Sequence, residues 1–245
     1  MKQQALFSVV YEDKQIMAVN KASGVAVGGD RWDAAKERLD LLLPYRVFTV
    51  HRIDRDTSGL VLFARDEETQ RQLSVAFENR LVKKRYIAII HGRPAWAETT
   101  CELSLVPDGD KQHRTIIDQY QGKKSRTVFR VLGSVGTYSV IEALPETGRT
   151  HQIRVHLARL GYPLVCDSLY GRSQKPVLLS SFKRGWRGDT FEERPLLARL
   201  GLHALSLVTL ERKFHAPLAR DMAALITQMG KNTGNEALLS LLGEQ

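Results

Sequence analysis

His51-Arg52-Ile53-Asp54-Arg55-Asp56-Thr57-Ser58-Gly59 is a charged stretch between two apolar runs, within residues 47–50 and 60–63. This pattern predicts two buried strands joined by a polar turn. Two carboxylates and two arginines lie within five residues of this turn. Such a turn can hold a few side chains rigidly at the edge of a cleft, where chemistry is usually placed. The alternative is that Asp54 and Asp56 only pair with Arg52 and Arg55 on the surface.

The composition points to a globular protein with a polyanionic partner. A chain of 245 residues forms one large domain or two small ones, and 43% hydrophobic residues can build a sizeable core. The formal net charge is +9, for which nucleic acid is the first candidate partner. A membrane surface is the alternative, but the sequence shows no basic amphipathic anchor and no long apolar run, so we expect no membrane contact.

The two cysteines and the first residues indicate a reduced, cytoplasmic protein. Cys101 and Cys166 are isolated, without the spacing of a disulfide framework or a zinc site. The apolar stretch within residues 5–10 is too short for the core of a signal peptide.

Strand and helix patterns alternate along the chain. We expect strands at 16–19, 47–50, 60–63, 84–90, 127–132, 137–144 and 204–210, and a strand-like run at 177–179. We expect helices at 33–43, from an Asp66 cap to residue 81, from a Thr150 cap to residue 159, and from an Asp221 cap onward. The two strands around Gly133-Ser134-Val135-Gly136 predict a hairpin. Mixed strands and hairpins with a few helices indicate an α+β fold.

Two further segments carry residues suited to chemistry on RNA. Lys84-Arg85-Tyr86 lies on a predicted strand, where Tyr86 offers a flat surface for a nucleobase, although a buried core tyrosine is the alternative. The second segment is Thr147-Gly148-Arg149-Thr150-His151-Gln152-Ile153-Arg154-Val155-His156-Leu157. Its two histidines are five residues apart, which is poor spacing for two metal ligands on one helix face. We therefore expect no metal site.

These three segments, in this order, resemble the motifs of the RluA-type pseudouridine synthases. The first resembles H-R-L-D-x-x-T-S-G, with Ile53 in place of leucine, and the second resembles K-x-Y. Three other segments match more weakly. Asn20–Gly24 has Ala22 where the family has proline. Residues 161–171 have Cys166 where glycine is usual, and residues 202–204 are the third match. The competing kinase loop, H-R-D-x-x-x-x-N, is disfavoured because the aspartate is one place late and no glycine-rich loop is present.

The resemblance implies the pseudouridine synthase fold, with a mixed, mostly antiparallel sheet, flanking helices and a central RNA-binding cleft. It covers nearly the whole chain, so we expect a single catalytic domain over residues 1–245. The family pattern starts near Val10, so we expect the form of the family without the small RNA-binding domain that many relatives carry first. We expect a basic insertion at 172–199, where basic residues surround Trp186; RNA contact or a solvated loop would explain it.

By resemblance, Asp54 is the catalytic carboxylate, Arg154 is its ionic partner, and Tyr86 stacks on the target base. A guanidinium beside a sequestered carboxylate keeps it ionised. Arg52 is expected to occupy the place of the flipped base. The remaining RNA contacts are expected at His51, Arg55, Lys84 and Arg149.

The implied reaction converts uridine to pseudouridine in RNA. It needs no cofactor, in keeping with a sequence that shows no dinucleotide, ATP or metal motif. Asp54 could act as nucleophile or as base, and ribosomal RNA and transfer RNA are both open as substrates. The alternatives are a non-catalytic RNA-binding protein on the same fold and an enzyme that hydrolyses the glycosidic bond. We expect a monomer.

Overall fold

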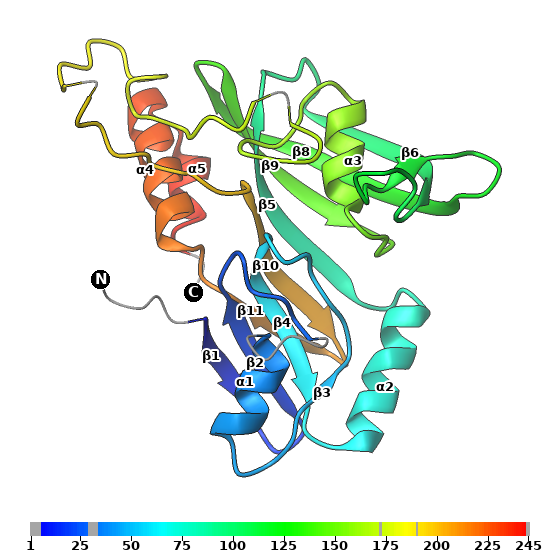
Figure 1. Ribbon diagram of the computed structural model, residues 1–245. Coiled ribbons are helices and arrows are strands. Elements are labelled where there is room, and N and C mark those ends of the chain that lie inside the picture. Colours follow the sequence, from blue (N-terminus) through cyan, green and yellow to red (C-terminus); the bar gives the residue numbers. More distant parts are fainter. Residues whose placement is uncertain (1–5, 29–33, 172, 190, 244–245) are drawn as a thin grey trace. The chain divides into compact units, whose positions relative to one another are not determined.

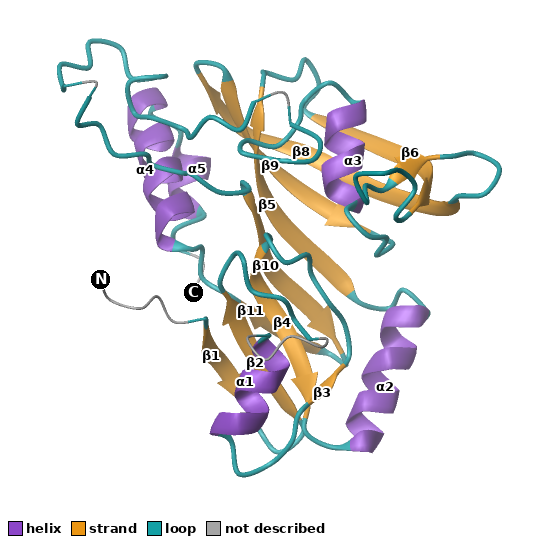
Figure 2. Cartoon of the chain, in the orientation of Figure 1, coloured by secondary structure: helices purple, strands orange, loops and turns teal. Residues whose placement is uncertain are grey.

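The computed structural model describes residues 6–28, 34–171, 173–189 and 191–243. The chain divides into two compact units. Unit 1 comprises Met1–Arg85 and His203–Pro217, and unit 2 comprises Tyr86–Leu202 and Leu218–Gln245. Figures 1 and 2 show the helices and strands of each unit. The expectation of a single catalytic domain over the whole chain stays a prediction.

Unit 1 is built on a sheet whose central strand is β4 (Ser58–Ala64). Its other strands are β1 (Phe7–Glu12), β2 (Ile16–Lys21), β3 (Phe48–Thr49), β10 (Leu202–Thr209) and β11 (Arg212–His215). The order is β1-β2-β4-β10, with β3 pairing to β4 and β11 to β10. The β4–β10 pair is parallel, and the other pairs are antiparallel.

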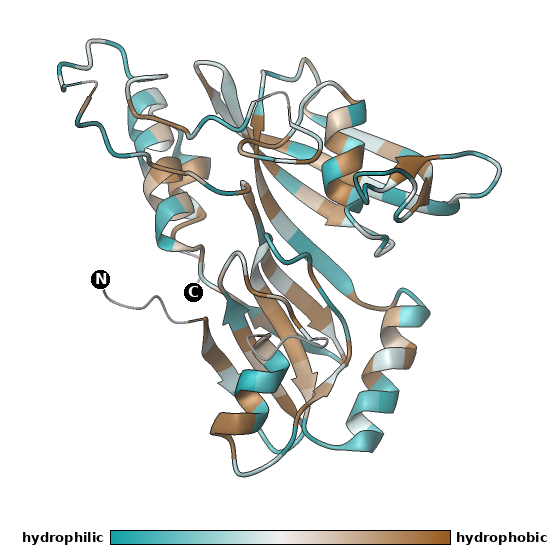
Figure 3. Ribbon diagram, in the orientation of Figure 1, coloured by the Kyte–Doolittle hydropathy of each residue, from teal (hydrophilic) through white to brown (hydrophobic). Residues whose placement is uncertain are grey.

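All seven residues of β4 are buried, and Figure 3 shows the hydrophobic colour along this strand. A strand covered on both faces reads as a continuous apolar run, as this sequence does. Helix α1 (Ala35–Leu42) buries Ala35 and Leu39, and helix α2 (Glu67–Glu78) packs beside β3 and β4. The predicted Asp66 cap is confirmed, because its carboxylate accepts a hydrogen bond of 2.7 Å from the Thr69 amide.

Unit 2 is built on an antiparallel sheet in the order β5-β9-β8-β6-β7. Its strands are β5 (Lys83–His91), which begins in unit 1, β6 (Glu98–Val106), β7 (Ile116–Ile117), β8 (Lys123–Val135) and β9 (Tyr138–Pro145). The predicted hairpin is the β8–β9 pair. Helix α3 (Gln152–Arg159) packs on β6 and β8, while α4 (Arg220–Thr233) and α5 (Glu236–Ser240) pack on β8 (Figure 1).

The predicted α+β class is confirmed, with a mixed and mostly antiparallel sheet. Ile153 and Leu157 of α3 enter the core with Phe129 of β8, and Leu160 packs against them, as the helical spacing predicts. Among the described residues, no helix is both long and apolar enough to cross a membrane.

Three predicted helix boundaries are wrong or shifted, and one predicted strand-like run is not a strand. Helix α3 is capped by His151, not Thr150, and α4 by Ala219, not Asp221, whose carboxylate pairs with Arg199 at 2.7 Å. Helix α2 ends at Glu78, because Arg80 adopts a left-handed conformation with φ of 60°. The run at 177–179 forms only an isolated bridge, from Val177 to Leu197. The predicted start of the first helix at Asp33 lies outside the described residues.

Gly59 is required where β4 meets β10. Its φ is +110°, and a Cβ atom there would lie 2.2 Å from the carbonyl oxygen of Ala204. We expect Gly59→Ala to lower the free energy of unfolding by at least about 2 kcal/mol, because strain and overlap add. Urea unfolding measures this. Gly24→Ala is the control, since Gly24 has a φ of +84° but a Cβ atom added there would meet no atom within 4 Å. Equal losses in the two variants would contradict the close approach as the cause.

Candidate active site

The signature loop joins β3 to β4 in unit 1 and exposes its arginines. Arg52 and Arg55 are exposed, Ile53 is 7% exposed, and Asp54 is half-buried. The Thr57 amide donates to the Asp54 carbonyl oxygen at 3.1 Å, which closes a turn directly after the aspartate. Asp54 is therefore presented from a hydrogen-bonded turn at the edge of a buried strand.

The turn after β2 braces this loop through a buried lysine. Lys21 is 1% exposed, and its ammonium group donates to the carbonyl oxygens of Ala22, Val25 and Arg55 at 2.6–3.0 Å. The Gly24 amide also donates to the Arg55 carbonyl at 2.9 Å. Ser23 Oγ donates to the Asp56 carbonyl at 2.6 Å. The weakly matching motif at Asn20–Gly24 thus holds the backbone of the signature loop, as its expected structural role requires.

The late motif at 202–204 holds the other end of the loop. Ser58 Oγ lies 2.9 Å from His203 Nδ1, and His203 Nε2 lies 3.2 Å from the Ala216 carbonyl oxygen. Because a carbonyl only accepts hydrogen bonds, Nε2 carries the proton and Nδ1 accepts from Ser58. Both side chains are buried, so this contact fixes the serine of the signature.

His51, a predicted RNA contact, is engaged within unit 1. Its Nε2 accepts a hydrogen bond of 2.9 Å from the Leu62 amide, and its ring stacks on Phe77 with centroids 4.6 Å apart. Burial, together with the positive charge of Lys84, lowers the pKa of His51 to about 3. The neutral imidazole therefore joins the loop to β4 and α2.

Tyr86 and Arg149 occupy defined places in unit 2. Tyr86 is half-buried on β5 and packs against the core that contains Ala88. Arg149 lies in the turn before α3, and its Nε donates to the Lys124 carbonyl at 3.3 Å. Lys84 is half-buried on the part of β5 that belongs to unit 1.

Arg154 forms a buried bidentate pair with Asp167. Its Nε lies 2.9 Å from Oδ2 and its Nη2 lies 2.7 Å from Oδ1, and the two side chains are 2% and 0% exposed. Burial by itself would raise the pKa of Asp167, but hydrogen bonds and charge from Arg154 outweigh it, so the pKa is lowered. The predicted pairing of Arg154 with Asp54 joins different units and stays a prediction.

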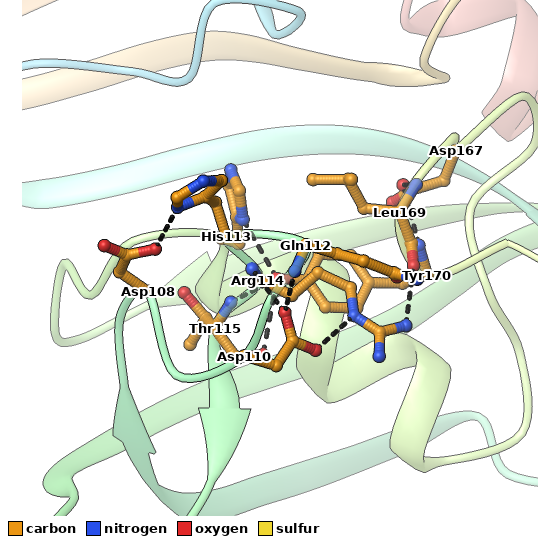
Figure 4. A network of polar contacts seen from close by, with 10 residues as sticks. Asp108, Asp110, Gln112, His113, Arg114, Thr115, Asp167, Leu169 and Tyr170 are labelled. Carbon is orange, nitrogen blue, oxygen red and sulfur yellow. Dashed lines mark hydrogen bonds and ion pairs between the residues drawn. The ribbon is translucent and has the colours of Figure 1, made fainter.

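A polar network around Tyr170 supports this pair, and Figure 4 shows its members Thr115, Asp167, Leu169 and Tyr170. The Tyr170 hydroxyl accepts from the Thr115 amide at 2.8 Å and lies 2.9 Å from His151 Nδ1. Asp167 Oδ1 also accepts from the amides of Leu169 and Tyr170 at 2.9 and 3.1 Å. The loop before β7, the turn after α3 and the start of α3 are thereby tied together. His151, which makes the contact with Tyr170, adopts a left-handed conformation with φ of 53°.

Gln152 shapes the turn that carries Arg149. Its Oε1 accepts from Thr147 Oγ1 at 2.7 Å and from the Arg149 amide at 3.0 Å. Its Nε2 donates to the Arg126 carbonyl at 3.0 Å and to Thr127 Oγ1 at 2.9 Å. Sequence reasoning missed both Gln152 and Asp167 as supports, although the motifs that contain them were noted. Among the described residues, no group of three or more His, Cys, Asp or Glu side chains could hold a metal ion.

Comparison with known proteins agrees with this arrangement of motifs. Residues 15–159 match the model of the RNA pseudouridylate synthase family. The chain belongs to this family. It is 34% identical over 232 residues to ribosomal large subunit pseudouridine synthase C of Vibrio cholerae, covering 90% of this chain and 69% of that protein. It is 30% identical over 237 residues to ribosomal large subunit pseudouridine synthase D of Zymomonas mobilis, and this match covers 90% of this chain and 72% of that protein.

The predicted family and enzyme class are confirmed by these relatives. The chain spans 53–75% of the length of eight of the curated relatives it matches. A solved structure, human RNA pseudouridylate synthase domain containing 4, superposes with a TM-score of 0.71 at 22% identity, covering 91% of this chain and 92% of that one. This likeness supports the pseudouridine synthase fold.

Breaking the buried pair should destabilise unit 2 strongly. We expect Asp167→Asn to lower the free energy of unfolding by about 3–5 kcal/mol, because it leaves the Arg154 guanidinium buried beside a neutral amide. Urea unfolding followed by tryptophan fluorescence measures the loss. Arg199→Gln is the control, since it breaks a bidentate pair whose side chains are 20% and 35% exposed. That pair should contribute about 1 kcal/mol or less. Similar losses in both variants would contradict burial as the cause.

His156 makes stability sensitive to mild acid. It is fully buried, its Nε2 lies 2.8 Å from Ser125 Oγ, and burial lowers its pKa to about 4. Unfolding returns the imidazole to an ordinary pKa of about 6.5. The contribution of neutral His156 to the free energy of unfolding is therefore fully present above pH 6.5. It falls as the pH drops towards 4, because His156 binds a proton at higher pH in the unfolded chain than in the folded one.

We expect His156 to account for a loss of about 1.4 kcal/mol between pH 7.5 and 5.5. Urea unfolding of His156→Gln at pH 7.5 and 5.5 tests this. The free energy of unfolding of the variant should fall between these two pH values by about 1.4 kcal/mol less than that of the unchanged protein, whatever the absolute stability of the variant. His113→Gln is the control, because the side chain of His113 is 85% exposed. An unchanged pH dependence in His156→Gln would exclude this histidine as the source.

Proposed function

We propose that this chain isomerises specific uridines to pseudouridine in structured RNA, with Asp54 as the catalytic carboxylate. The observation that carries the proposal is the signature loop. Its aspartate occupies the aspartate position of the family motif. Lys21 and Ser23 hold the loop backbone, and His203 holds the Ser58 side chain. Ribosomal RNA is the favoured substrate over transfer RNA, because relatives at 30% and 34% identity are named ribosomal large subunit pseudouridine synthases.

The reaction breaks the bond from the ribose to the uracil nitrogen and rejoins the ribose to carbon 5 of the same base. Asp54 has two routes: attack on the glycosidic carbon, or removal of the neighbouring ribose proton. Both need an ionised carboxylate close to the sugar. Nothing is oxidised or hydrolysed, so side chains alone suffice and we propose no cofactor.

The other predicted residues have distinct parts in the proposal. Tyr86 would stack on the target base, and Arg154 would keep Asp54 ionised. The target must first leave its helix, at a cost of a few kcal/mol. Arg52, which is exposed, would occupy the vacated place. Arg55, Lys84 and Arg149 would hold phosphates, whereas the contacts of His51 favour a supporting role in the loop.

Two rival functions predict different products. A non-catalytic RNA-binding protein on the same fold would leave uridine unchanged. Hydrolysis of the glycosidic bond would release free uracil and leave abasic RNA. Chromatography of digested RNA after incubation with the protein separates pseudouridine, uridine and free uracil, and therefore separates all three cases. The proposed monomeric state and cytoplasmic location are compatible with each of them.

The catalytic assignment is tested with RNA that carries tritium on carbon 5 of uridine. We expect the protein to release tritium from a 23S ribosomal RNA transcript and not from transfer RNA. Asp54→Asn should slow release at least about 100-fold, as expected for loss of an acid–base or nucleophilic group. Asp56→Asn is the matched control and should retain release, because Asp56 is outside the signature's aspartate position. Full activity in Asp54→Asn would refute the assignment.

A further inference from the structure

The bidentate pair with Asp167 holds one edge of the Arg154 guanidinium. Its two bonds, at 2.9 and 2.7 Å, run from Nε and Nη2 in the plane of the group. Neither bond touches a flat face of the guanidinium, so the plane can still tilt about the edge that is held. A residue that limits this tilt must lie against a face of the group.

The ring of Tyr170 lies against this guanidinium. Arg154 Cζ is placed over the ring, 5.2 Å from its centroid. A guanidinium within about 6 Å of an aromatic centroid is attracted to the ring, and its planar shape also allows it to stack there. Asp167 therefore holds an edge of the Arg154 guanidinium, and Tyr170 covers it from the side of the ring.

The backbone that carries Tyr170 is closed onto Asp167. The Gly171 amide donates to the Asp167 carbonyl oxygen at 3.1 Å, and a Cβ atom on Gly171 would lie 2.4 Å from that oxygen. The Tyr170 amide donates to Asp167 Oδ1 at 3.1 Å. The carboxylate and the ring that contact Arg154 are therefore tied together in one closely packed turn.

The hydroxyl end of Tyr170 is held by two other segments (Figure 4). It accepts from the Thr115 amide at 2.8 Å and lies 2.9 Å from His151 Nδ1 at the start of α3. Thr115 Oγ1 donates in turn to the Thr150 carbonyl oxygen at 3.0 Å. Burial raises the pKa of Tyr170 above its usual value of 10.0, so the hydroxyl stays neutral and can both donate and accept. The ring is therefore anchored at its backbone and at its hydroxyl.

We propose that Tyr170 is a positioning residue of the isomerisation, and that its ring sets the direction of the Arg154 guanidinium. The donors of a guanidinium form a rigid fork, so the direction of its plane decides what they can reach. A reacting group that is misplaced by about 1 Å can cost about 100-fold in rate. The inference rests on the proposed function, because that function assigns Arg154 to the reaction. The rival roles of Tyr170 are a purely structural one and direct contact with RNA.

Two substitutions separate the ring from the hydroxyl in the tritium assay. Tyr170→Leu should lower kcat about 10- to 100-fold and leave the KM for RNA within about twofold, because the ring acts through Arg154 and not on the RNA. Tyr170→Phe keeps the ring and should keep kcat within about threefold. Equal losses of kcat in both variants would assign the effect to the hydroxyl and overturn the proposal. A raised KM with kcat unchanged would make Tyr170 an RNA contact, which also overturns it.

The matched control is Tyr138→Leu. It makes the same substitution at a tyrosine of unit 2 that is 8% exposed and whose ring contacts the rings of His91 and Phe182. This variant should lower the free energy of unfolding in urea and leave kcat within about twofold. The loss of kcat expected of Tyr170→Leu, if it appeared in Tyr138→Leu as well, would show that loosening unit 2 is enough to slow the reaction. The positioning role would then be refuted.

A double variant tests whether Tyr170 acts through Arg154. Arg154→Lys keeps a positive charge opposite Asp167 but lacks the planar guanidinium that the ring contacts. In this background, Tyr170→Leu should change kcat by less than about threefold, because the group that it positions is already lost. Losses that simply multiply would mean that the two residues act independently, contrary to the proposal.

The Arg154 Nε–H signal in a nuclear magnetic resonance spectrum tests the positioning without catalysis. It is identified, in protein with isotope-labelled arginine, as the signal that Arg154→Lys removes. Magnetisation transfer from this proton to the Tyr170 ring protons is expected in the unchanged protein, and its absence would overturn the proposal even if Tyr170→Leu failed to fold. Tyr170→Leu should speed exchange of the proton with water, and unaltered exchange would contradict a positioning role. Failure to form pseudouridine would refute the proposed function, while this signal would still decide the role of the ring.

Discussion

The buried ammonium group of Lys21 is the interaction on which the signature loop depends. A charged amine that is 1% exposed is costly unless its donors are satisfied, and here they are directed to the carbonyl oxygens of Ala22, Val25 and Arg55. Arg55 directly follows Asp54 in the chain. The contact with Arg55 forms because the turn after β2 lies against the signature loop, and it holds the backbone that presents the candidate catalytic carboxylate.

Unit 2 uses a buried cation in a comparable way. Arg154 is held by Asp167, whose carboxylate also binds two amides of the following turn. Left-handed residues flank both partners: His151 lies one turn before Arg154 with φ of 53°, and Cys166 directly precedes Asp167 with φ of 55°. A non-glycine residue in this conformation costs about 1–2 kcal/mol. The family pattern usually has glycine where this chain has Cys166, so the strained geometry itself accounts for the family's preference.

The sequence predicts most of the elements because their signals are local. Buried runs such as β4, the β8–β9 hairpin and the Asp66 cap are specified by neighbouring residues. The errors arise where a distant partner decides. His151, whose ring contacts the distant Tyr170, is the cap residue of α3 in place of Thr150, and the Asp221 carboxylate pairs with Arg199 instead of capping α4. The support of Arg154 by Asp167 was missed for the same reason, since resemblance assigned that arginine to Asp54 alone.

The sequence gives the net charge of the chain, but tertiary contacts decide which of its cations are neutralised. A formal charge of +9 predicts a polyanionic partner but does not say which cations meet it. Along β8, the pairing register puts Glu102 opposite Arg126, and both Glu98 and Glu142 opposite Arg130, so these arginines are neutralised across the sheet. Lys123 and Lys124 face Leu105 and Ser104 instead. Cross-strand register, rather than the number of basic residues, therefore determines which positive charges remain available to an RNA phosphate.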